Sequence, residues 1–216
     1  MTLPEPPPEF DDDFRADLET LLRWRRDVRR FLRDPLDPGL VDRLLDLADL
    51  APSVGNSQPW RFVAVESAAA RAAVRANFAA ANAEALAAQP DDRRHLYASL
   101  KLAGLDRAPV QLAVFTDAGT AQGHGLGRLT MPQTLEHSTA MAVHTLWLAA
   151  RAAGIGVGWV SILDPEQLCR DLAVPAEWRL TAYLCLGRPQ EEHADPELER
   201  AGWQPRTGRG RALLRR

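Results

Sequence analysis

The sequence has little cysteine and no long apolar run, and both shortages narrow the class of protein. Only two of its 216 residues are cysteines, Cys169 and Cys185, and they lack the paired spacing of a disulfide framework or a zinc site. We therefore expect a reduced, cytoplasmic protein. No apolar stretch approaches the roughly 20 residues of a membrane span. The start, MTLPEPPPEFDDDF, is proline-rich and acidic, unlike a signal peptide. We expect no membrane partner.

An overall excess of positive charge is also absent. The formal net charge is -3 at pH 7, whereas a domain that binds nucleic acid usually presents a basic face. We therefore expect no nucleic-acid partner. With 46% hydrophobic and 25% charged residues, the composition is typical of a globular protein. The length favours one domain that can form a core without disulfides or metal.

Several motifs that define large enzyme classes are missing. The sequence has no G-x-G-x-x-G after a strand, no Walker loop, no HExxH, no CxxC and no G-x-S-x-G. His137 and His144 are seven residues apart on a predicted helix, which places them about 10 Å apart. We therefore predict no metal site, and we exclude the dinucleotide-binding, nucleoside-triphosphatase and serine-hydrolase classes.

The pattern of apolar residues predicts an α+β protein, rich in helix, with a small sheet whose strands are far apart in the sequence. Asp13 is predicted to cap a first helix that runs from about Phe14 to Leu32. Further helices are expected at 40–51, 68–88, 93–105, 133–154 and 164–173. Strands are expected at 60–66, 110–116, 157–163 and 179–187, and the glycine-rich stretch 118–132 is expected to be a loop. We expect residues 1–12 to be a flexible arm, 13–206 the domain and 207–216 a basic tail.

The stretch LLRWRRDVRRFL, residues 21–32, has one acid, Asp27, inside a block of arginines. On a helix, Arg25 and Arg29 would share one face, and converging guanidinium groups bind phosphate well. The alternative is a solvated helix face on which Asp27 is the counter-ion. The residues by themselves leave both interpretations open.

Two other stretches have the composition of a ligand site. APSVGNSQPWRF, residues 51–62, offers amide and hydroxyl groups that suit the edge of a heteroaromatic ring with carbonyls and ring nitrogens. The alternative is an ordinary polar turn in which Trp60 belongs to the core. GIGVGWVSILDPEQL, residues 154–168, is a strand leading into a capped helix, and its glycines would let a flat ligand approach the backbone. Ser161 is expected in that strand, and the alternative is a buried serine bonded to backbone.

Together these segments, in this order and spacing, resemble the flavin-dependent nitroreductase superfamily. Within it the sequence is most similar to the 5,6-dimethylbenzimidazole synthase family, through RRDVR, LKLAGLDRAPV, GRLTMPQT, LWLAARAAGIGVGWVSI, AYLCLG and PELERAGWQPR. The resemblance implies a nitroreductase-like α+β fold with a small mixed sheet surrounded by helices. It also implies an interlocked homodimer with FMN at the interface.

The resemblance further implies an enzyme that consumes its flavin. Reduced FMN and O₂ would react to give 5,6-dimethylbenzimidazole, the lower ligand of vitamin B12, and erythrose 4-phosphate. An NAD(P)H-dependent flavin reductase would act upstream as partner. The alternatives are an NAD(P)H-dependent FMN nitroreductase, which recycles its flavin, and a non-catalytic flavin carrier.

By the same resemblance, Asp27 and Ser161 are the expected catalytic residues. A general acid/base role is expected for Asp27, although neighbouring arginines should lower the pKa of its carboxyl. The residues expected to bind FMN are Arg25, Arg26, Val28, Arg29, Ser53, Asn56, Ser57, Gln58, Leu105, Met131, Trp159 and Ile162.

Overall fold

The computed structural model describes residues 6–100, 104–208 and 212–216. Its sheet has four strands in the order β1-β2-β4-β3. They are β1 (Trp60–Ala64), β2 (Val110–Asp117), β3 (Gly156–Val160) and β4 (Trp178–Gly187). All three ladders between these strands are antiparallel, so the prediction of a mixed sheet was wrong for them. Side chains alternate in the same way in parallel and antiparallel strands, so the sequence pattern does not distinguish the two. The connections between the strands decide which arrangement forms.

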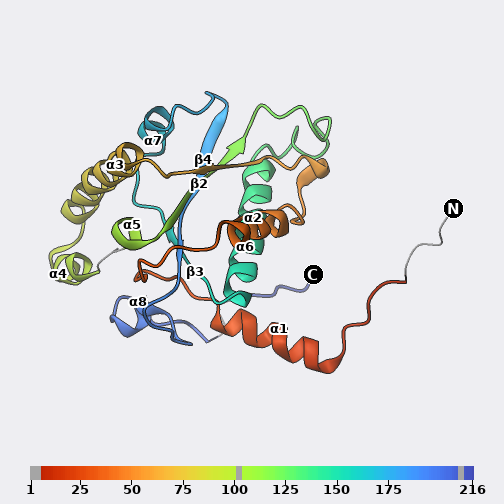
Figure 1. Cartoon of the computed structure of the whole chain (residues 1–216), viewed down its shortest axis with the longest axis horizontal. Coiled ribbons are helices and arrows are strands. Elements are labelled where there is room, and N and C mark those ends of the chain that lie inside the picture. The colour runs from red at the N-terminus through yellow and green to blue at the C-terminus, as the bar shows by residue number, and fades with distance from the viewer. Residues whose placement is uncertain (1–5, 101–103, 209–211) are drawn as a thin grey trace.

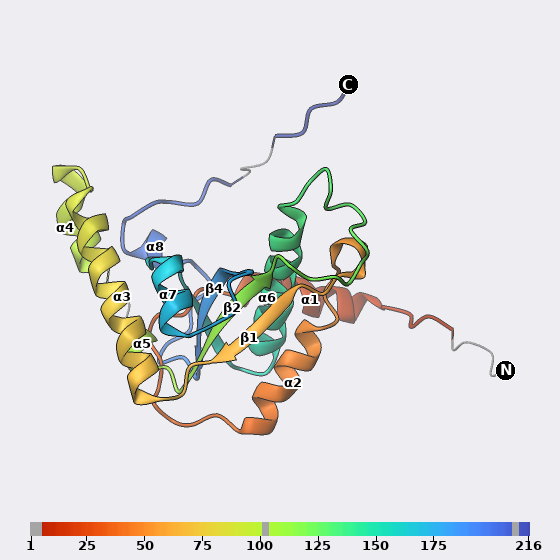
Figure 2. The ribbon, with the colours of Figure 1, turned by 90° about the horizontal axis from the view of Figure 1, so that it is seen from above.

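Helices cover both faces of the sheet (Figures 1 and 2). On one face lie α2 (Pro38–Ala48) and α6 (Thr134–Ala152); on the other lie α3 (Ala68–Ala87), α5 (Gly104–Arg107) and α7 (Pro165–Asp171). Strand β2 serves both layers, because alternate side chains of a strand point to opposite faces. Its Leu112 and Val114 join the α2/α6 core, whereas Ala113 and Phe115 join the other. The remaining helical elements are α1 (Asp12–Trp24), η1 (Val54–Asn56), α4 (Asp91–Ser99) and α8 (Glu197–Arg200).

The first helix differs from its prediction at both ends. Asp11, not Asp13, caps it by accepting a hydrogen bond from the Phe14 N–H at 2.8 Å. The helix ends at Trp24, and the chain from 25 to 32 is extended. The Val28 N–H donates to the Val157 carbonyl at 3.0 Å, and the Leu32 N–H donates to the Arg188 carbonyl at 2.8 Å. Pairing with distant backbone therefore overrides local helix propensity.

The other predicted elements are present, with ends shifted by a few residues. One exception is the helix expected over 93–105, which is divided into α4 and α5; residues 101–103, between them, lie outside the described part of the chain. The predicted cap of α7 is confirmed, because the Asp164 side chain accepts from the Glu166 and Gln167 N–H groups. None of the helices in the described part of the chain combines the length and the hydropathy of a membrane-spanning segment.

Candidate functional site

Residues 25–32, here called the arginine segment, lie against the edge strand β3 because two glycines leave room for them. A methyl group at Gly158 would lie 2.2 Å from the Val28 carbonyl oxygen, and one at Gly156 would lie 2.8 Å from a Val28 methyl carbon. The segment is anchored by Phe31, whose side chain is fully buried. We expected these glycines to let a flat ligand approach the strand. That expectation was wrong for Gly156 and Gly158, because Val28 of the arginine segment, not a ligand, lies against these two glycines.

The packing of the arginine segment against β3 fixes the position of the Asp27 carboxylate. One oxygen, Oδ1, accepts a hydrogen bond from the Trp159 N–H at 2.9 Å, and Oδ2 accepts from Arg29 Nε at 3.3 Å. The side chain remains 38% exposed, yet loss of hydration raises the pKa of its carboxyl above the ordinary value. The Trp159 amide and Arg29 oppose that rise, and Glu197 adds to it. The expected lowering of the Asp27 pKa was therefore wrong. Arg29 is the arginine that bonds Asp27, and its contact is too long to outweigh desolvation.

Beside Asp27 is a cavity of about 360 Å³ with four arginines in its wall. Arg25, Arg26 and Arg29 come from the arginine segment, and Arg206 comes from the far end of the chain. Burial lowers the pKa of Arg25, and the charge of Arg206 lowers it further, although Asp27 works in the opposite direction. Converging guanidinium groups that repel one another favour an anion, and a phosphate offers the acceptors that they need. Sequence reasoning missed Arg206, although it ends the quoted motif PELERAGWQPR.

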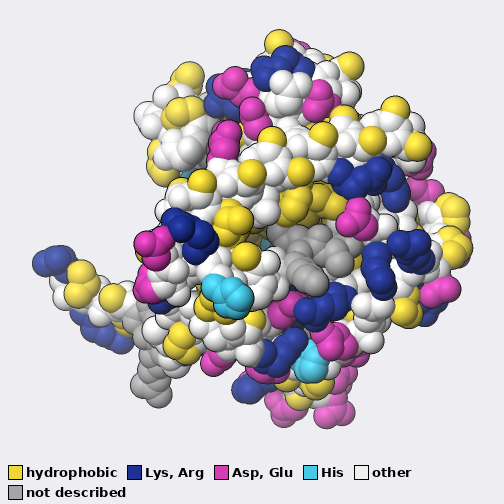
Figure 3. Space-filling view, turned by 90° about the vertical axis from the view of Figure 1, so that its left-hand side faces the viewer, with side chains coloured by type: hydrophobic (Ala, Val, Ile, Leu, Met, Phe, Trp, Pro, Cys, Tyr) yellow, Lys and Arg dark blue, Asp and Glu magenta, His cyan; other side chains and the backbone are white. Residues whose placement is uncertain are grey.

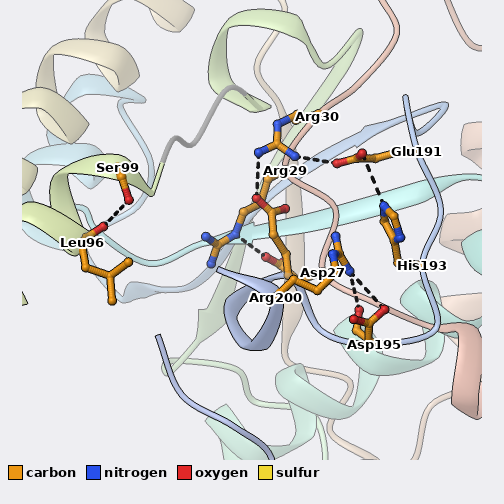
Figure 4. A network of polar contacts seen from close by, with 10 residues as sticks. Asp27, Arg29, Arg30, Leu96, Ser99, Glu191, His193, Asp195 and Arg200 are labelled. Atoms are coloured by element: carbon orange, nitrogen blue, oxygen red, sulfur yellow. Dashed lines mark hydrogen bonds and ion pairs between the residues drawn. The ribbon is translucent and has the colours of Figure 1, made fainter. Parts of the chain in front are cut away.

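The fourth arginine of RRDVRR has a different role. Arg30 donates to Glu191 at 2.5 Å and to Glu197 at 3.1 Å, and Glu191 also contacts His193 at 3.3 Å (Figure 4). Figure 3 shows acidic and basic side chains mixed on this side of the molecule, as ion pairing requires. The alternative of a solvated helix face with Asp27 as its counter-ion was therefore wrong for Arg30, which is not on a helix and pairs with two glutamates. Phosphate binding by the other arginines of the block stays a prediction. Three arginines line a cavity, and Arg30 is paired with acids.

The polar loop 51–59 is held by a hydrogen bond within it and by two from the glycine-rich loop. Ser53 Oγ accepts from the Gln58 N–H at 3.1 Å. Gln122, from the glycine-rich loop, donates to the Asn56 carbonyl at 2.8 Å and to the Gln58 side chain at 2.9 Å. Ser57 is buried, and its hydroxyl has no hydrogen-bond partner among the described residues. A buried polar group without a partner is uncommon and marks a place where a ligand could supply one.

This loop and the arginine segment lie at different ends of α6 (Figure 1). The Val54 N–H donates to Ser138 Oγ at 3.0 Å, whereas Trp147 Nε1 donates to the Arg26 carbonyl at 3.3 Å. Ser138 and Trp147 are nine residues apart, which is about 13 Å along a helix. Within one chain, the two groups of predicted flavin-binding residues are therefore apart.

Ser161 follows β3 and is exposed, so it is neither in the strand as expected nor the buried serine of the alternative reading. It lies two residues beyond Trp159, whose amide binds Asp27. The other predicted flavin-binding residues are spread out. Val28, Trp159 and Ile162 are half-buried, Leu105 is in the core, and Met131 is 49% exposed just before α6. The described residues contain no cluster of three or more metal-ligating side chains.

Comparison with known proteins decides the family. The model of the Nitroreductase family matches residues 22–188, which is well over half of the chain. The chain belongs to the nitroreductase family. This nitroreductase family member is 60% identical to the 5,6-dimethylbenzimidazole synthase of Rhodospirillum rubrum, over 92% of this chain and 94% of that protein. It is 54% identical to the enzyme of the same name from Rhodobacter capsulatus, over 90% and 94% respectively.

Similarity to other nitroreductase family members is lower. A Thermus thermophilus NADH dehydrogenase is 32% identical, over 82% of this chain and 88% of that protein. Among solved structures, iodotyrosine deiodinase bound to FMN and 3-iodo-L-tyrosine has a TM-score of 0.70 at 24% identity, covering 92% of this chain and 97% of that chain. This last likeness shows the fold, and the predicted nitroreductase-like fold is thereby confirmed.

Proposed function

We propose that the protein is a 5,6-dimethylbenzimidazole synthase, an oxidoreductase that takes reduced FMN and O₂ as substrates. The products would be 5,6-dimethylbenzimidazole, for the lower ligand of vitamin B12, erythrose 4-phosphate and the pyrimidine part of the flavin. That part would leave as dialuric acid, whose composition accounts for both oxygen atoms of O₂. Reduced FMN supplies the benzene ring, both of the nitrogens attached to it and one ribityl carbon, and the other ribityl carbons leave with the phosphate. Support comes from 60% and 54% identity to proteins of that name over nearly their whole length.

The residues on the cavity wall fit FMN at its phosphate end. Arg25, Arg26, Arg29 and Arg206 form a cationic wall around about 360 Å³, and guanidinium forks match phosphate oxygens. The polar loop 51–59, with the unpartnered Ser57 hydroxyl, suits the polar edge of the ring. We place both within one FMN-binding domain, residues 13–206, with a flexible arm at 1–12 and a basic tail at 207–216.

A homodimer would bring these two parts together. Their contact points on α6, Ser138 and Trp147, lie about 13 Å apart along the helix in one chain, so a single subunit presents them as two separate surfaces. The amphipathic helix α1 has no buried residue, and Phe14, Leu18 and Leu22 are exposed on it. Apolar side chains gathered on one helix are typical of a surface that another chain covers. We propose that the arginine segment of one subunit and the polar loop of the other bind the same FMN.

The observation that carries this proposal is the position and the pKa of Asp27. Its carboxylate is on the wall of the arginine-lined cavity, and its pKa is raised. Oδ1 is held by the Trp159 N–H at 2.9 Å, whereas Oδ2 has only the longer Arg29 contact at 3.3 Å, so Oδ2 is the atom that would hold or release a proton during cleavage. A carboxyl that keeps its proton nearer to neutral pH is a better general acid/base. Ser161, just beyond the strand that holds Asp27, would hydrogen-bond and orient the flavin ring.

An upstream NAD(P)H-dependent flavin reductase would supply the reduced FMN, in the cytoplasm. Two alternatives retain the flavin. An FMN nitroreductase would recycle it, and a carrier would deliver it unchanged. Both alternatives predict that no benzimidazole forms, either with the wild type or with a variant of Asp27.

A single-turnover experiment tests the proposal. FMN is bound without oxygen and reduced, air is admitted, and absorbance and product chromatography are followed. We expect the flavin to be lost and 5,6-dimethylbenzimidazole to appear with the wild type and with the control Asp46→Asn, which changes an exposed acid on α2. Asp27→Asn should abolish the product while FMN still binds. Full return of the oxidised FMN spectrum with the wild type would reject the synthase and favour a nitroreductase or a carrier.

A further inference from the structure

Helix α3 is rich in alanine and buries only two side chains within the described structure, Val74 and Asn77. Asparagine is a poor residue for the middle of a helix, because its amide competes for backbone hydrogen bonds. A buried amide must also find partners to offset the loss of water. Asn77, which is 7% exposed, therefore has a specific task in this fold.

That task is to hold the backbone of Asp164 on both sides. Asn77 Nδ2 donates to the Asp164 carbonyl at 2.9 Å, and the Asp164 N–H donates to Asn77 Oδ1 at 2.8 Å. The two bonds use the donor and the acceptor of the amide at once, as a strand partner would. Asp164 is also fixed by its own side chain, which caps α7 through the Glu166 and Gln167 N–H groups at 3.0 Å each.

This clamp forms one end of a short bridge that carries Ser161. The other end is Val160, the last residue of β3, which pairs with Tyr183 of β4. Only residues 161–163 connect the two fixed points, and Leu163 packs against the core. Ser161 itself is exposed, so its position depends on these two anchors.

We propose that Asn77 is a positioning residue that sets the location of Ser161 relative to Asp27. Asp27 is held by the amide of Trp159, on the strand side of the bridge, and Asn77 fixes the helix side. The inference rests on the proposed role of Ser161 in flavin cleavage. Asn77 does not line the arginine cavity, and both hydrogen bonds of its side chain are to Asp164.

A double-mutant cycle tests this inference by the single-turnover yield and rate of 5,6-dimethylbenzimidazole. Asn77→Ala, Ser161→Ala and the double variant are compared at a temperature at which circular dichroism shows each to be folded. Displacement of a catalytic group by about 1 Å can cost roughly 100-fold in rate. We expect Asn77→Ala to slow cleavage about ten-fold or more by this effect, with FMN affinity unchanged. In the Ser161→Ala background the same change should add nothing, because coupled residues are not additive.

The matched control is Asn82→Ala on the same helix, where Asn82 accepts a hydrogen bond from the Tyr97 hydroxyl at 3.0 Å and does not touch the bridge. It should leave cleavage unchanged. If Asn77→Ala does not fold, Asn77→Asp, which keeps the acceptor for the Asp164 N–H, takes its place in the cycle and should slow cleavage less.

Two results would overturn the inference while the proposed function stands. In one, Ser161→Ala is impaired but Asn77→Ala cleaves flavin at the wild-type rate. In the other, Asn77→Ala slows cleavage equally in both backgrounds. A fully active Ser161→Ala would instead refute the role of Ser161, and with it the positioning role of Asn77.

Discussion

Replacing Gly158 by alanine tests whether the candidate site depends on the packing of the arginine segment against β3. The new methyl group would lie 2.2 Å from the Val28 carbonyl oxygen, whereas carbon–oxygen contacts are normally about 3.3 Å or longer. The arginine segment must therefore move by about 1 Å. That shift lengthens the Val28–Val157 bond, now 3.0 Å, and the Asp27–Trp159 bond, now 2.9 Å, beyond hydrogen-bonding distance.

The magnitude follows from those two bonds. A backbone hydrogen bond contributes about 1 kcal/mol, and one to a charged group about 1.5–3 kcal/mol. The free energy of unfolding should fall by about 2–4 kcal/mol. In a protein of this size that lowers Tm by roughly 5–15 °C. Cleavage of reduced FMN should slow by about 100-fold, because Asp27 moves by about 1 Å.

The assays are a thermal melt and the single-turnover reaction, each compared with Gly208→Ala. Gly208 has the same chemical change, nothing within 4 Å of the added methyl group and no positive φ. If Gly158→Ala and Gly208→Ala melt together and cleave flavin equally fast, the arginine segment is not held by β3, and the account of Asp27 given above is wrong.

Two further predictions concern charge. Arg206→Ala should weaken FMN binding about ten-fold, which is the low end of the range for a hydrogen bond between charged groups. We expect the low end because Arg206 is exposed. Riboflavin, which lacks the phosphate, should bind as before. Fluorescence titration against Arg170→Ala checks this, and equal losses for both flavins would contradict a phosphate contact. The folded apoprotein holds the Asp27 proton more tightly than the unfolded chain, whose ordinary pKa is 3.8. From that pH up to the raised pKa of Asp27, the wild type should lose stability relative to Asp27→Asn as pH rises, and then differ by a constant amount. Denaturant melts across pH measure the difference; a gap that does not change with pH would refute the raised pKa.

The sequence by itself determined the element types and the chemistry available. Apolar patterning located α2 and α6, alanine-rich composition located α3, and the cap Asp164, correctly predicted, located α7, each to within a few residues. These features are local, because a cap or a helical face involves residues only a few positions apart. The resemblance to the nitroreductase superfamily was likewise visible in linear motifs, and the predicted fold is confirmed.

Only the tertiary structure decided what the arginine block does. The block looks helical in isolation, yet residues 25–32 are extended because Gly156 and Gly158 leave a place for them on β3, about 130 positions away. Strand direction, the hydrogen bond that holds Asp27 and the entry of Arg206 into the cavity wall depend on the same kind of contact. Desolvation, and with it the pKa of Asp27, comes from groups brought together only by folding. A linear pattern supplies the charges, but the distances between them, which set the energies, arise from the packed chain.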